Sequence, residues 1–555
     1  MDRLQRLNQL PEHEVYDTRV VLQRTGDSET AQDDYALRRV PATWRWSAWG
    51  SLWAFSGMST AMAYPLTAAL LAMVLGGSAV VCALILSMLY TWVGVWYMSK
   101  KAANEGAILE LISKHTFGFK GSAYQIVVFG LLGTIYFSLE GHVMATALTE
   151  SVPMLSYKLS AALICAAFIP LTMYGMQFLS RFQSLTVWLY ALGIVLALVG
   201  LFGGWSSEIS SKLASARWWE VNPGNAPFSW VAVLSAFGAF SGLLGSILVL
   251  LCTDTARFAR RHEAGKVAAL TSLIGATVPV IATTLFGIYL LASSGGKVPD
   301  PGVSLVRLLG SGGLFLIIVT QLRVNVINVY FGTNALENFA SQVFKLNWKR
   351  SRFLIPFMII AYLIVTSPFL AYFGTIMTML SIFLFNWTMV LFGDLMLVRK
   401  RFDLPQWSEF RRGYVAQYNK IGMISMWVPT VVGVVMGSGF FGVKVQALAV
   451  PLSGAAAFLM PTLVSRMMSR TSVIDQYFAR IPESVAALSE EHQCDVCTHS
   501  FHRSDFVLCP YHGGKFICSN CCAAEKSCGT MCHTESIVSA PASRKGAPVT
   551  AAGTV

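Results

Sequence analysis

Twelve long apolar runs constrain this sequence more than any other feature, because they require lipid rather than water as the solvent. Each run has about 20 residues, enough for an α-helix to cross a hydrocarbon layer of about 30 Å. The composition agrees, since 54% of the residues are hydrophobic and 13% are charged, against about 25% charged in soluble domains. We therefore predict an all-α integral membrane protein with about 12 transmembrane helices. The runs lie at residues 47–74, 78–98, 122–148, 159–177, 184–204, 228–252, 268–292, 312–334, 354–373, 375–397, 424–442 and 446–465.

The net charge of +12 is explained by where the Lys and Arg residues stand. Most of them lie in alternate connections between the runs, such as Lys100 and Lys101 after the second run and residues 399–401 after the tenth. Because Lys and Arg near helix ends stay preferentially on the cytoplasmic side, we predict a multi-pass protein of the cell membrane with both termini in the cytoplasm. Orientation and anionic headgroups of the lipid bilayer account for the basic excess, so we expect no nucleic-acid partner.

Polarity divides the chain into four parts. Residues 1–45 are polar and contain no cleavable signal peptide, so we expect a cytoplasmic N-terminal segment. Residues 46–470 hold the apolar runs and form the transmembrane domain, and residues 471–534 form a short cytoplasmic segment rich in Cys. Residues 535–555 are rich in Ala, Pro, Ser and Gly, which is typical of a disordered tail or a linker.

Four local motifs stand beside the third, sixth, eighth and tenth runs: HTFGFKGS at 115–122, TDTARF at 253–258, NVINVYFG at 325–332 and GDLMLVRKR at 393–401. In this order they resemble the nucleobase:cation symporter family, the group of the cytosine permease and the allantoin and hydantoin transporters. The resemblance implies a LeuT-like fold, with two inverted five-helix repeats followed by two further helices. It also implies a permease rather than an enzyme: a symporter that moves a small planar nitrogenous solute, such as a purine or cytosine, with Na⁺ or H⁺ by alternating access.

Small residues interrupt two of the runs near their middle. The first run contains Ser56, Gly57 and Met58, and the sixth contains three Gly and two Ser within residues 237–246. A broken helix frees backbone N–H and C=O groups, which is tolerated at mid-membrane depth only beside a polar cavity or a ligand. We expect the two segments to form a symmetric pair of breaks at the substrate site. Tight helix packing by small residues is the alternative.

Polar residues inside the runs mark candidate binding groups, because burying them in lipid is costly. Glu140 follows Tyr136 by four residues and shares its helix face. The resemblance implies that Tyr136 stacks on a flat substrate and that Glu140 replaces an amide that binds its edge; Phe237 or Phe240 would supply a second aromatic ring and Asn325 an amide. Hydrogen bonds from Glu140 to a neighbouring helix or to His142 are the alternative.

Charged residues in and beside the runs suggest an ion site and a gate. Arg323 needs an anion or water at its depth, and its partner is predicted to be Glu140 or Asp394. The resemblance places a hydroxyl ligand for Na⁺ at Thr320; proton coupling through Glu140 is the alternative. Asp254, Arg257 and Asp394 stand at helix ends, either as a gate of salt bridges or as ordinary solvated caps.

Eight of the eleven Cys residues crowd into the segment before the tail. Disulfides are disfavoured in the reducing cytoplasm, and two Cys-x-x-Cys pairs have the spacing of a tetrahedral Zn²⁺ site. A structural Zn²⁺ site is therefore predicted, with an iron–sulfur cluster as the alternative. The candidate ligands are Cys494, Cys497, Cys509, His512, Cys518, Cys521, Cys528 and Cys532.

A second hypothesis of function comes from this domain order. A permease-like domain followed by a metal-binding segment and a tail could be a solute sensor of a signalling protein, with a cytoplasmic protein partner for the Cys-rich segment. Both hypotheses involve a small-molecule ligand bound within the bilayer.

Overall fold

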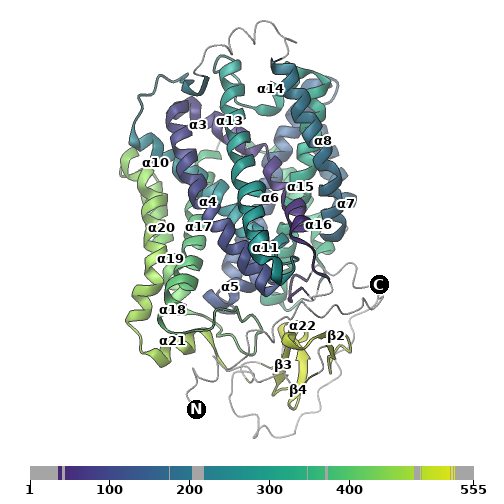
Figure 1. The fold of residues 1–555 in the computed structure, drawn as a ribbon, viewed down its shortest axis with the longest axis vertical. Coiled ribbons are helices and arrows are strands. Elements are labelled where there is room, and N and C mark those ends of the chain that lie inside the picture. Colours follow the sequence, from purple (N-terminus) through teal and green to yellow (C-terminus); the bar gives the residue numbers. More distant parts are fainter. Residues whose placement is uncertain are drawn as a thin grey trace.

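The structure is a computed structural model that describes residues 35–40, 44–173, 176–202, 218–346, 348–368, 373–480, 488, 491–525, 527–528 and 531. A bundle of long helices forms most of the molecule, and a small unit of short strands and one short helix lies against one end of the bundle (Figure 1). We name the described residues from 491 onwards the Cys-rich module, and the end of the bundle that it contacts the module end.

Each of the twelve apolar runs coincides with a helix or with a pair of helices, which confirms the predicted fold class. Among the described residues, nine helical segments are long and apolar enough to cross a membrane, and α7, α8 and α16 fall on the other three runs. The helices of the bundle are α2 (Ala48–Phe55), α3 (Ala63–Leu75), α4 (Gly77–Glu105), α5 (Leu109–Phe117), α6 (Ala123–Ser151), α7 (Tyr157–Thr172), α8 (Met176–Phe202), α10 (Trp230–Gly238), α11 (Ser246–Ala256), α12 (Ala264–Ala269), α13 (Val278–Ser293), α14 (Pro301–Leu309), α15 (Ser311–Phe339), α16 (Leu354–Thr366), α17 (Phe373–Phe392), α18 (Arg399–Arg401), α19 (Lys420–Gly437), α20 (Val443–Arg466) and α21 (Arg470–Tyr477).

The first run is broken where the sequence predicts. Helix α2 ends at Phe55, a single 3₁₀ turn follows at Met58–Thr60, and α3 begins only at Ala63. Gly57 lets α8 approach the break closely, because a Cβ atom there would lie 2.5 Å from Nε2 of Gln183 on α8. The N–H groups at the start of α3 are therefore left without intrahelical partners in the interior of the bundle.

The sixth run is not broken, which corrects the prediction of a symmetric pair. A π-helix at Ala239–Gly245 joins α10 to α11 without an interruption. The wider turns keep the chain helical and shift the hydrogen-bond ladder, as shown by the backbone N–H of Ser246, which donates to the carbonyl of Ser241, five residues earlier. Small residues therefore allow a local change of helix type here instead of a gap.

Helices α6 and α15 come into backbone contact near the centre of the bundle. A Cβ atom on Gly133 would lie 2.6 Å from Cα of Gly332 and 2.8 Å from the carbonyl oxygen of Asn328. This close approach of small residues is a common way for membrane helices to pack. It fixes the distance between the two helices that carry Glu140 and Arg323.

The Cys-rich module consists of two antiparallel strand pairs and one helix. Strands β1 (Glu491–Gln493) and β2 (Ser500–His502) form one pair, and β3 (Phe506–Cys509) and β4 (Lys515–Cys518) form the other, followed by α22 (Ser519–Ala524). Tyr414, from the connection between α18 and α19, belongs to the apolar core of the module. The module core is therefore completed by a residue of the membrane domain.

Basic side chains of the module end bind carbonyl groups of the module. Arg411 donates to the carbonyl of Phe506 at 2.7 Å, Arg412 to that of Glu525 at 2.6 Å, and Lys345 to that of Ala523 at 3.3 Å. The three donors come from the ends of two different membrane segments. The module thus links the connection after α18 to the end of the helix that follows α15.

Candidate substrate, cation and metal sites

Glu140 lies at the break of the first run. Its carboxylate accepts hydrogen bonds from the backbone N–H groups of Met62 and Ala63, each at 2.9 Å, and from Nε2 of Gln321 on α15 at 2.8 Å. The side chain is 1% exposed. A carboxylate at a helix N-terminus satisfies free N–H groups and interacts favourably with the helix dipole. Glu140 therefore holds the start of α3 against α6 and α15.

Two of the predicted aromatic residues stand beside the π-helix. The hydroxyl of Tyr136 donates a 2.6 Å hydrogen bond to the carbonyl of Leu243, and Phe240 is fully buried in the same segment. Phe237 instead packs its ring 6.3 Å from that of Phe385 on α17. The structure therefore joins Tyr136 and Glu140 on α6 to the break and to the π-helix, whereas Phe237 contacts the helix of the tenth run.

A row of amides continues from Glu140 along α15. Asn325 donates from Nδ2 to Oε1 of Gln321 at 3.3 Å, and Asn328 donates to Oδ1 of Asn325 at 3.1 Å. All three amides are at most 1% exposed. The predicted binding residue Asn325 thus belongs to a chain of polar groups that ends on the carboxylate of Glu140.

Arg323 does not pair with Glu140 or Asp394, so both predicted partners are wrong. Its Nη1 donates to the carbonyl of Gln183 at 2.6 Å and to the hydroxyl of Thr186 at 2.7 Å, and its Nη2 donates to the hydroxyl of Ser56 at 2.7 Å. Among the described residues, no carboxylate forms a salt bridge with it. The guanidinium is therefore held by neutral oxygens of α8 and of the break. A prediction that pairs buried Arg residues with carboxylates does not find such partners.

Thr320 stands one turn before Arg323 on α15. Its hydroxyl donates to the carbonyl of Ile317 in the same helix at 2.8 Å, and its own carbonyl accepts a 3.3 Å hydrogen bond from Thr60 at the break. The Thr60 hydroxyl also donates to the carbonyl of Gly57 at 2.7 Å. The hydroxyl predicted as a Na⁺ ligand thus lies beside the break and has an intrahelical partner.

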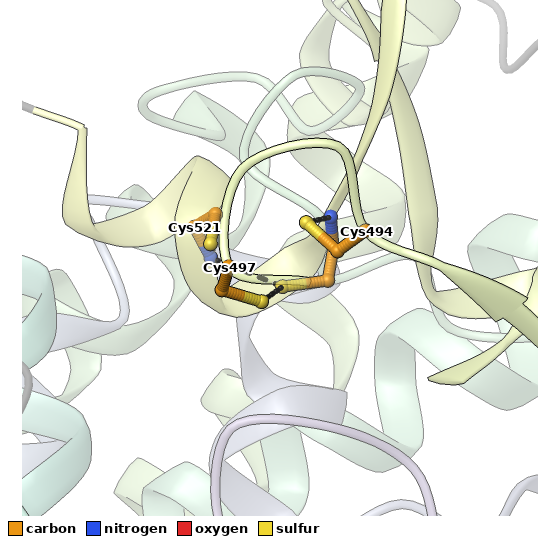
Figure 2. Close-up of side chains that lie close together, drawn as sticks. Cys494, Cys497 and Cys521 are labelled. Carbon is orange, nitrogen blue, oxygen red and sulfur yellow. Dashed lines mark hydrogen bonds between the residues drawn. The ribbon is translucent and has the colours of Figure 1, made fainter. Parts of the chain in front are cut away.

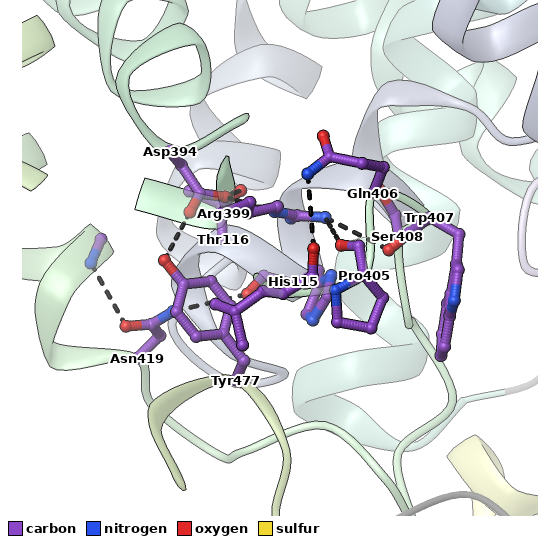
Figure 3. A network of polar contacts seen from close by, with 12 residues as sticks. His115, Thr116, Asp394, Arg399, Pro405, Gln406, Trp407, Ser408, Asn419 and Tyr477 are labelled. Carbon is purple, nitrogen blue, oxygen red and sulfur yellow. Dashed lines mark hydrogen bonds and ion pairs between the residues drawn. The ribbon is translucent and has the colours of Figure 1, made fainter. Parts of the chain in front are cut away.

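Asp394 forms a buried network at the module end (Figure 3). Arg399 pairs with its carboxylate at 3.1 Å, Thr116 on α5 donates to it at 2.7 Å, and the Tyr477 hydroxyl of α21 also donates to it. Arg399 further donates to the carbonyl of Trp407 at 3.2 Å. Asp394 and Arg399 are therefore buried residues that tie α5, α21 and the connection after α18 together, not solvated caps.

Asp254 and Arg257 stand at the end of α11, and Arg257 binds backbone and hydroxyl oxygens there. Arg257 donates from Nε to the backbone carbonyl of Asp254 at 3.2 Å, from Nη1 to the carbonyl of Tyr35 at 2.7 Å, and from Nη2 to the Tyr330 hydroxyl at 3.3 Å. Both carboxylate oxygens of Asp254 are buried without a hydrogen-bond partner among the described residues. Arg257 thus fixes residues 35–40 against the bundle.

Four Cys residues of the module form a compact group: Cys494, Cys497, Cys518 and Cys521. Their sulfur atoms lie within 4.8 Å of one another, and Figure 2 shows the labelled side chains gathered between a loop and α22. The sulfurs of Cys497 and Cys518 are 3.8 Å apart, which is about the separation of two thiolates in a tetrahedral Zn²⁺ site with bonds of about 2.3 Å. Backbone N–H groups of Cys518 and Cys521 also donate to sulfur. The group fits a tetrahedral metal ion.

The other predicted metal ligands lie outside this group. Cys509 approaches Nδ1 of His512 at 3.3 Å, and Nε2 of His512 lies 3.7 Å from a carboxylate oxygen of Glu525. Cys528 is buried and is not one of the four clustered residues. Cys532 lies outside the described residues. Among the described residues one group of four Cys lies close together, and Cys509, His512 and Cys528 stay candidate ligands of a second site.

Gln321 and Gln183 are site residues that the sequence analysis did not single out. Gln321 binds Glu140, and Gln183 exchanges hydrogen bonds with Arg323, since its Nε2 donates to the Arg323 carbonyl at 2.6 Å. Gln321 is a polar residue inside the eighth apolar run, so the rule that selected Glu140 and Arg323 also applies to it. Gln183 stands just before the fifth run, so that rule does not select it.

Comparisons with known proteins place this fold among membrane transporters. No family model matches the sequence, and no curated protein matches it. Similar solved structures include Mhp1, a nucleobase-cation-symport-1 family transporter, in a closed conformation with bromovinylhydantoin bound, at a TM-score of 0.57, with 16% identity over 81% of this chain and 99% of that chain. The inward-facing conformation of Mhp1 has a TM-score of 0.55, with 15% identity over 82% of this chain and 99% of that chain.

A Na⁺-coupled sialic acid symporter, in a substrate-bound outward-open state, is also similar. Its TM-score is 0.55, with 12% identity over 84% of this chain and 97% of that chain. At these identities the comparisons show the fold. The chain is therefore a multi-pass membrane protein with the LeuT-like fold that its structural neighbours use for cation-coupled symport, as the sequence motifs predict.

Proposed function

We propose that this protein is a secondary transporter that moves a small planar nitrogenous solute, such as a nucleobase, allantoin or a hydantoin, by alternating access. The observation that carries the proposal is the carboxylate of Glu140 at the break between α2 and α3, bound to the N–H groups of Met62 and Ala63 and to Gln321. An interrupted helix that meets buried side-chain acceptors and amides is the kind of site that transporters place near the bilayer midplane.

The solute class follows from the chemistry of the groups around the break. The ring of Tyr136 offers a flat apolar surface, and Glu140 and Asn325 offer acceptors and donors at known positions along α6 and α15. A flat heterocycle with N–H and C=O groups on its edge matches such a set. We assign substrate contacts to Ser56, Gly57, Met58, Tyr136, Glu140, Phe240 and Asn325, with Phe237 as a second aromatic contact after a change of conformation.

The coupling ion is H⁺ in this proposal. The positive charge of Arg323 already binds the oxygens of Ser56, Gln183 and Thr186 beside the break, and a second cation close to it would be repelled. Glu140 can instead take up a proton. Protonation removes the negative charge that the N-terminus of α3 favours, so it weakens the link between the break and α6. A Na⁺ ion at Thr320 is the competing assignment.

The module end faces the cytoplasm in this proposal, and the four-Cys group binds a structural Zn²⁺ ion. The small module has few apolar residues of its own, so a metal would supply folding free energy through the thiolates of Cys494, Cys497, Cys518 and Cys521. Metal analysis of the purified protein tests this assignment. Zn²⁺ at about one ion per chain supports it, whereas iron with acid-labile sulfide supports the cluster alternative.

Uptake measurements test the transport function. The purified protein is reconstituted into liposomes and supplied separately with radiolabelled cytosine, allantoin and hydantoin. Saturable accumulation of one of these solutes, competed by the unlabelled compound and lost in Glu140→Ala, is the expected result. Thermal stabilisation by a solute that is never accumulated would favour the solute sensor.

The sensor remains the second candidate because the module contacts the bundle directly. Lys345, which follows the helical segment after α15, and Arg412 both donate to carbonyls at the end of α22. A change in the position of α15 would therefore reach the module. A cytoplasmic protein partner of the module belongs to this hypothesis only.

A further inference from the structure

A second pair of acidic residues lies buried at the module end, away from the break. Glu110 on α5 is 0% exposed and Asp254 on α11 is 2% exposed. None of their four carboxylate oxygens has a hydrogen-bond partner among the described residues. Buried polar atoms in folded proteins almost always have hydrogen-bond partners, either protein groups or ordered water, and a buried carboxylate without partners favours its neutral, protonated form. The pair therefore needs an explanation beyond packing.

The chain brings the two carboxylates together. The hydroxyl of Thr253, the residue before Asp254, accepts a 3.1 Å hydrogen bond from the N–H of Leu109, the residue before Glu110. The two carboxylates and Arg257 are close enough to interact electrostatically. Two like charges held this near each other in a buried place disfavour double ionisation.

The surrounding basic groups have other hydrogen-bond partners. Lys114, one turn after Glu110, points its Nζ to the amide oxygen of Asn338 at 3.4 Å. Arg257 donates to the carbonyls of Asp254 and Tyr35 and to the Tyr330 hydroxyl. Lys114 faces the pair from α5 and Arg257 from the end of α11, and Lys345 lies beyond Lys114.

Two buried amide side chains near this end also lack hydrogen-bond partners among the described residues. Gln125 on α6 and Asn334 on α15 are fully buried, and neither end of either amide has a partner among the described residues. Asn334 lies one turn before Asn338, the partner of Lys114. The module end therefore encloses polar groups from α5, α6, α11 and α15 that have no hydrogen-bond partner among the described residues.

We propose that Glu110 and Asp254 form a proton-binding site that takes up one proton when the module end closes around it and releases that proton to water when the module end opens. The proton comes from water and binds one carboxylate oxygen, so the buried pair carries one negative charge instead of two. The single positive charge of Arg257, which interacts with both carboxyl groups, offsets that remaining charge. The inference rests on alternating access in the proposed function, but it does not depend on the solute or on Glu140.

Burial is the physical reason for the coupling to closure. It raises the pKa of Glu110 to about 7, against the opposing influence of Arg257 and Lys114. Exposure to water removes this desolvation, so the carboxyl returns toward its ordinary pKa and loses its proton near neutral pH. Closing of the module end and proton binding therefore favour each other.

The first test is infrared spectroscopy of the full-length protein in detergent, without a solute. The expected result is a band of protonated carboxyl groups at pH 6 that decreases by pH 8 and that is reduced in both Glu110→Gln and Asp254→Asn. Glu105→Gln is the matched control. Glu105 is a buried carboxylate of the same end that is already bound by Lys101 at 2.5 Å and by the N–H of Ser408 at 3.2 Å. An unchanged band in both test variants would overturn the proposal.

The second test is solute counterflow in liposomes at pH values from 6 to 8, with the solute that accumulates in the uptake assay. We expect the wild-type exchange rate to rise with pH, because deprotonation favours opening. We expect the Glu110→Gln, Asp254→Asn double variant to be slowed about tenfold at pH 8 and to show a smaller rise in rate with pH than the wild type, because only Glu140 still titrates. Glu105→Gln should behave as wild type. A double variant with the wild-type pH profile would overturn this inference alone. Absence of transport by the wild type would overturn the proposed function, and the infrared test would then decide whether the proton-binding site exists.

Discussion

Nε2 of Gln321 donates a 2.8 Å hydrogen bond to the carboxylate of Glu140, which joins α15 to α6 at the point where the first transmembrane run is broken. The same carboxylate accepts the N–H groups of Met62 and Ala63. One ionisable side chain therefore connects three membrane segments, and a change of its charge affects all three.

Removing the Glu140 side chain should lower both stability and transport. In Glu140→Ala two N–H groups of α3 and the amide of Gln321 lose their acceptor, which costs about 1–3 kcal/mol for each buried group left unpaired. Glu140→Gln keeps the size of the side chain but cannot bind the coupling proton. Because Gln retains one acceptor oxygen for the three donors, we expect Glu140→Gln to lose less thermal stability than Glu140→Ala and to lose accumulation at least tenfold. Equal accumulation by Glu140→Gln and the wild type would contradict the proposed role.

The contact between α6 and α15 can be tested with two glycines of α6. A Cβ on Gly133 would lie 2.6 Å from the backbone of Gly332, whereas a Cβ on Gly141 would meet its nearest neighbour at 3.7 Å. Gly133→Ala should destabilise the protein by about 1–3 kcal/mol, because two backbones must separate. Gly141→Ala is the control and should be neutral or stabilising by up to about 1 kcal/mol. Thermal unfolding measures both; similar losses in the two variants would refute the close backbone contact.

Removing the metal ligands should affect the module first. Cys518→Ser is expected to reduce the bound Zn²⁺ by about one ion per chain and to make the segment around 491–525 sensitive to protease, because the metal holds the small core together. Cys82→Ser, on α4, is the control and should change neither property. Cys509→Ser decides whether a second ion is present: retention of all bound Zn²⁺ would restrict the site to the four clustered Cys residues.

The pH dependence of stability should reveal Glu110. Its folded-state pKa of about 7 lies above the ordinary value of 4.5 for the unfolded chain. The folded protein therefore binds the proton more tightly, and the stability contributed by this group is fully present below pH 4.5 and is lost as the pH rises to 7. Gln cannot titrate, so the Tm of Glu110→Gln relative to wild type should become more positive from pH 5 to pH 8. A difference that is constant with pH would show that Glu110 does not titrate in this range.

Sequence patterns were sufficient for the helices because a membrane span must satisfy its backbone internally. Each apolar run became a helix, and Ser56 and Gly57 marked a true break. The sixth run shows the limit of this logic. Its small residues fit a gap and a π-helix equally well, and the choice depends on packing against Tyr136, whose hydroxyl binds the carbonyl of Leu243.

Partners of buried charges were harder to predict than their positions. Arg323 was recognised as an unusual residue, but its partners are a carbonyl and two hydroxyls, which many segments can supply.

Sequence spacing identified the metal-binding segment, because the four clustered Cys residues come as two Cys-x-x-Cys pairs. Sequence spacing could not separate the four clustered Cys residues from Cys509 and Cys528, because their distances depend on how β3, β4 and α22 pack together.

The driving force for solute uptake tests the central claim most directly. Proteoliposomes that contain the wild-type protein are given either an inward proton gradient or an inward Na⁺ gradient, with the solute identified in the uptake assay. Because Arg323 supplies the positive charge beside the break and Glu140 binds the coupling proton, the proton gradient alone should drive accumulation, and Glu140→Gln should abolish that response. Accumulation driven by Na⁺ and indifferent to the proton gradient would contradict the account.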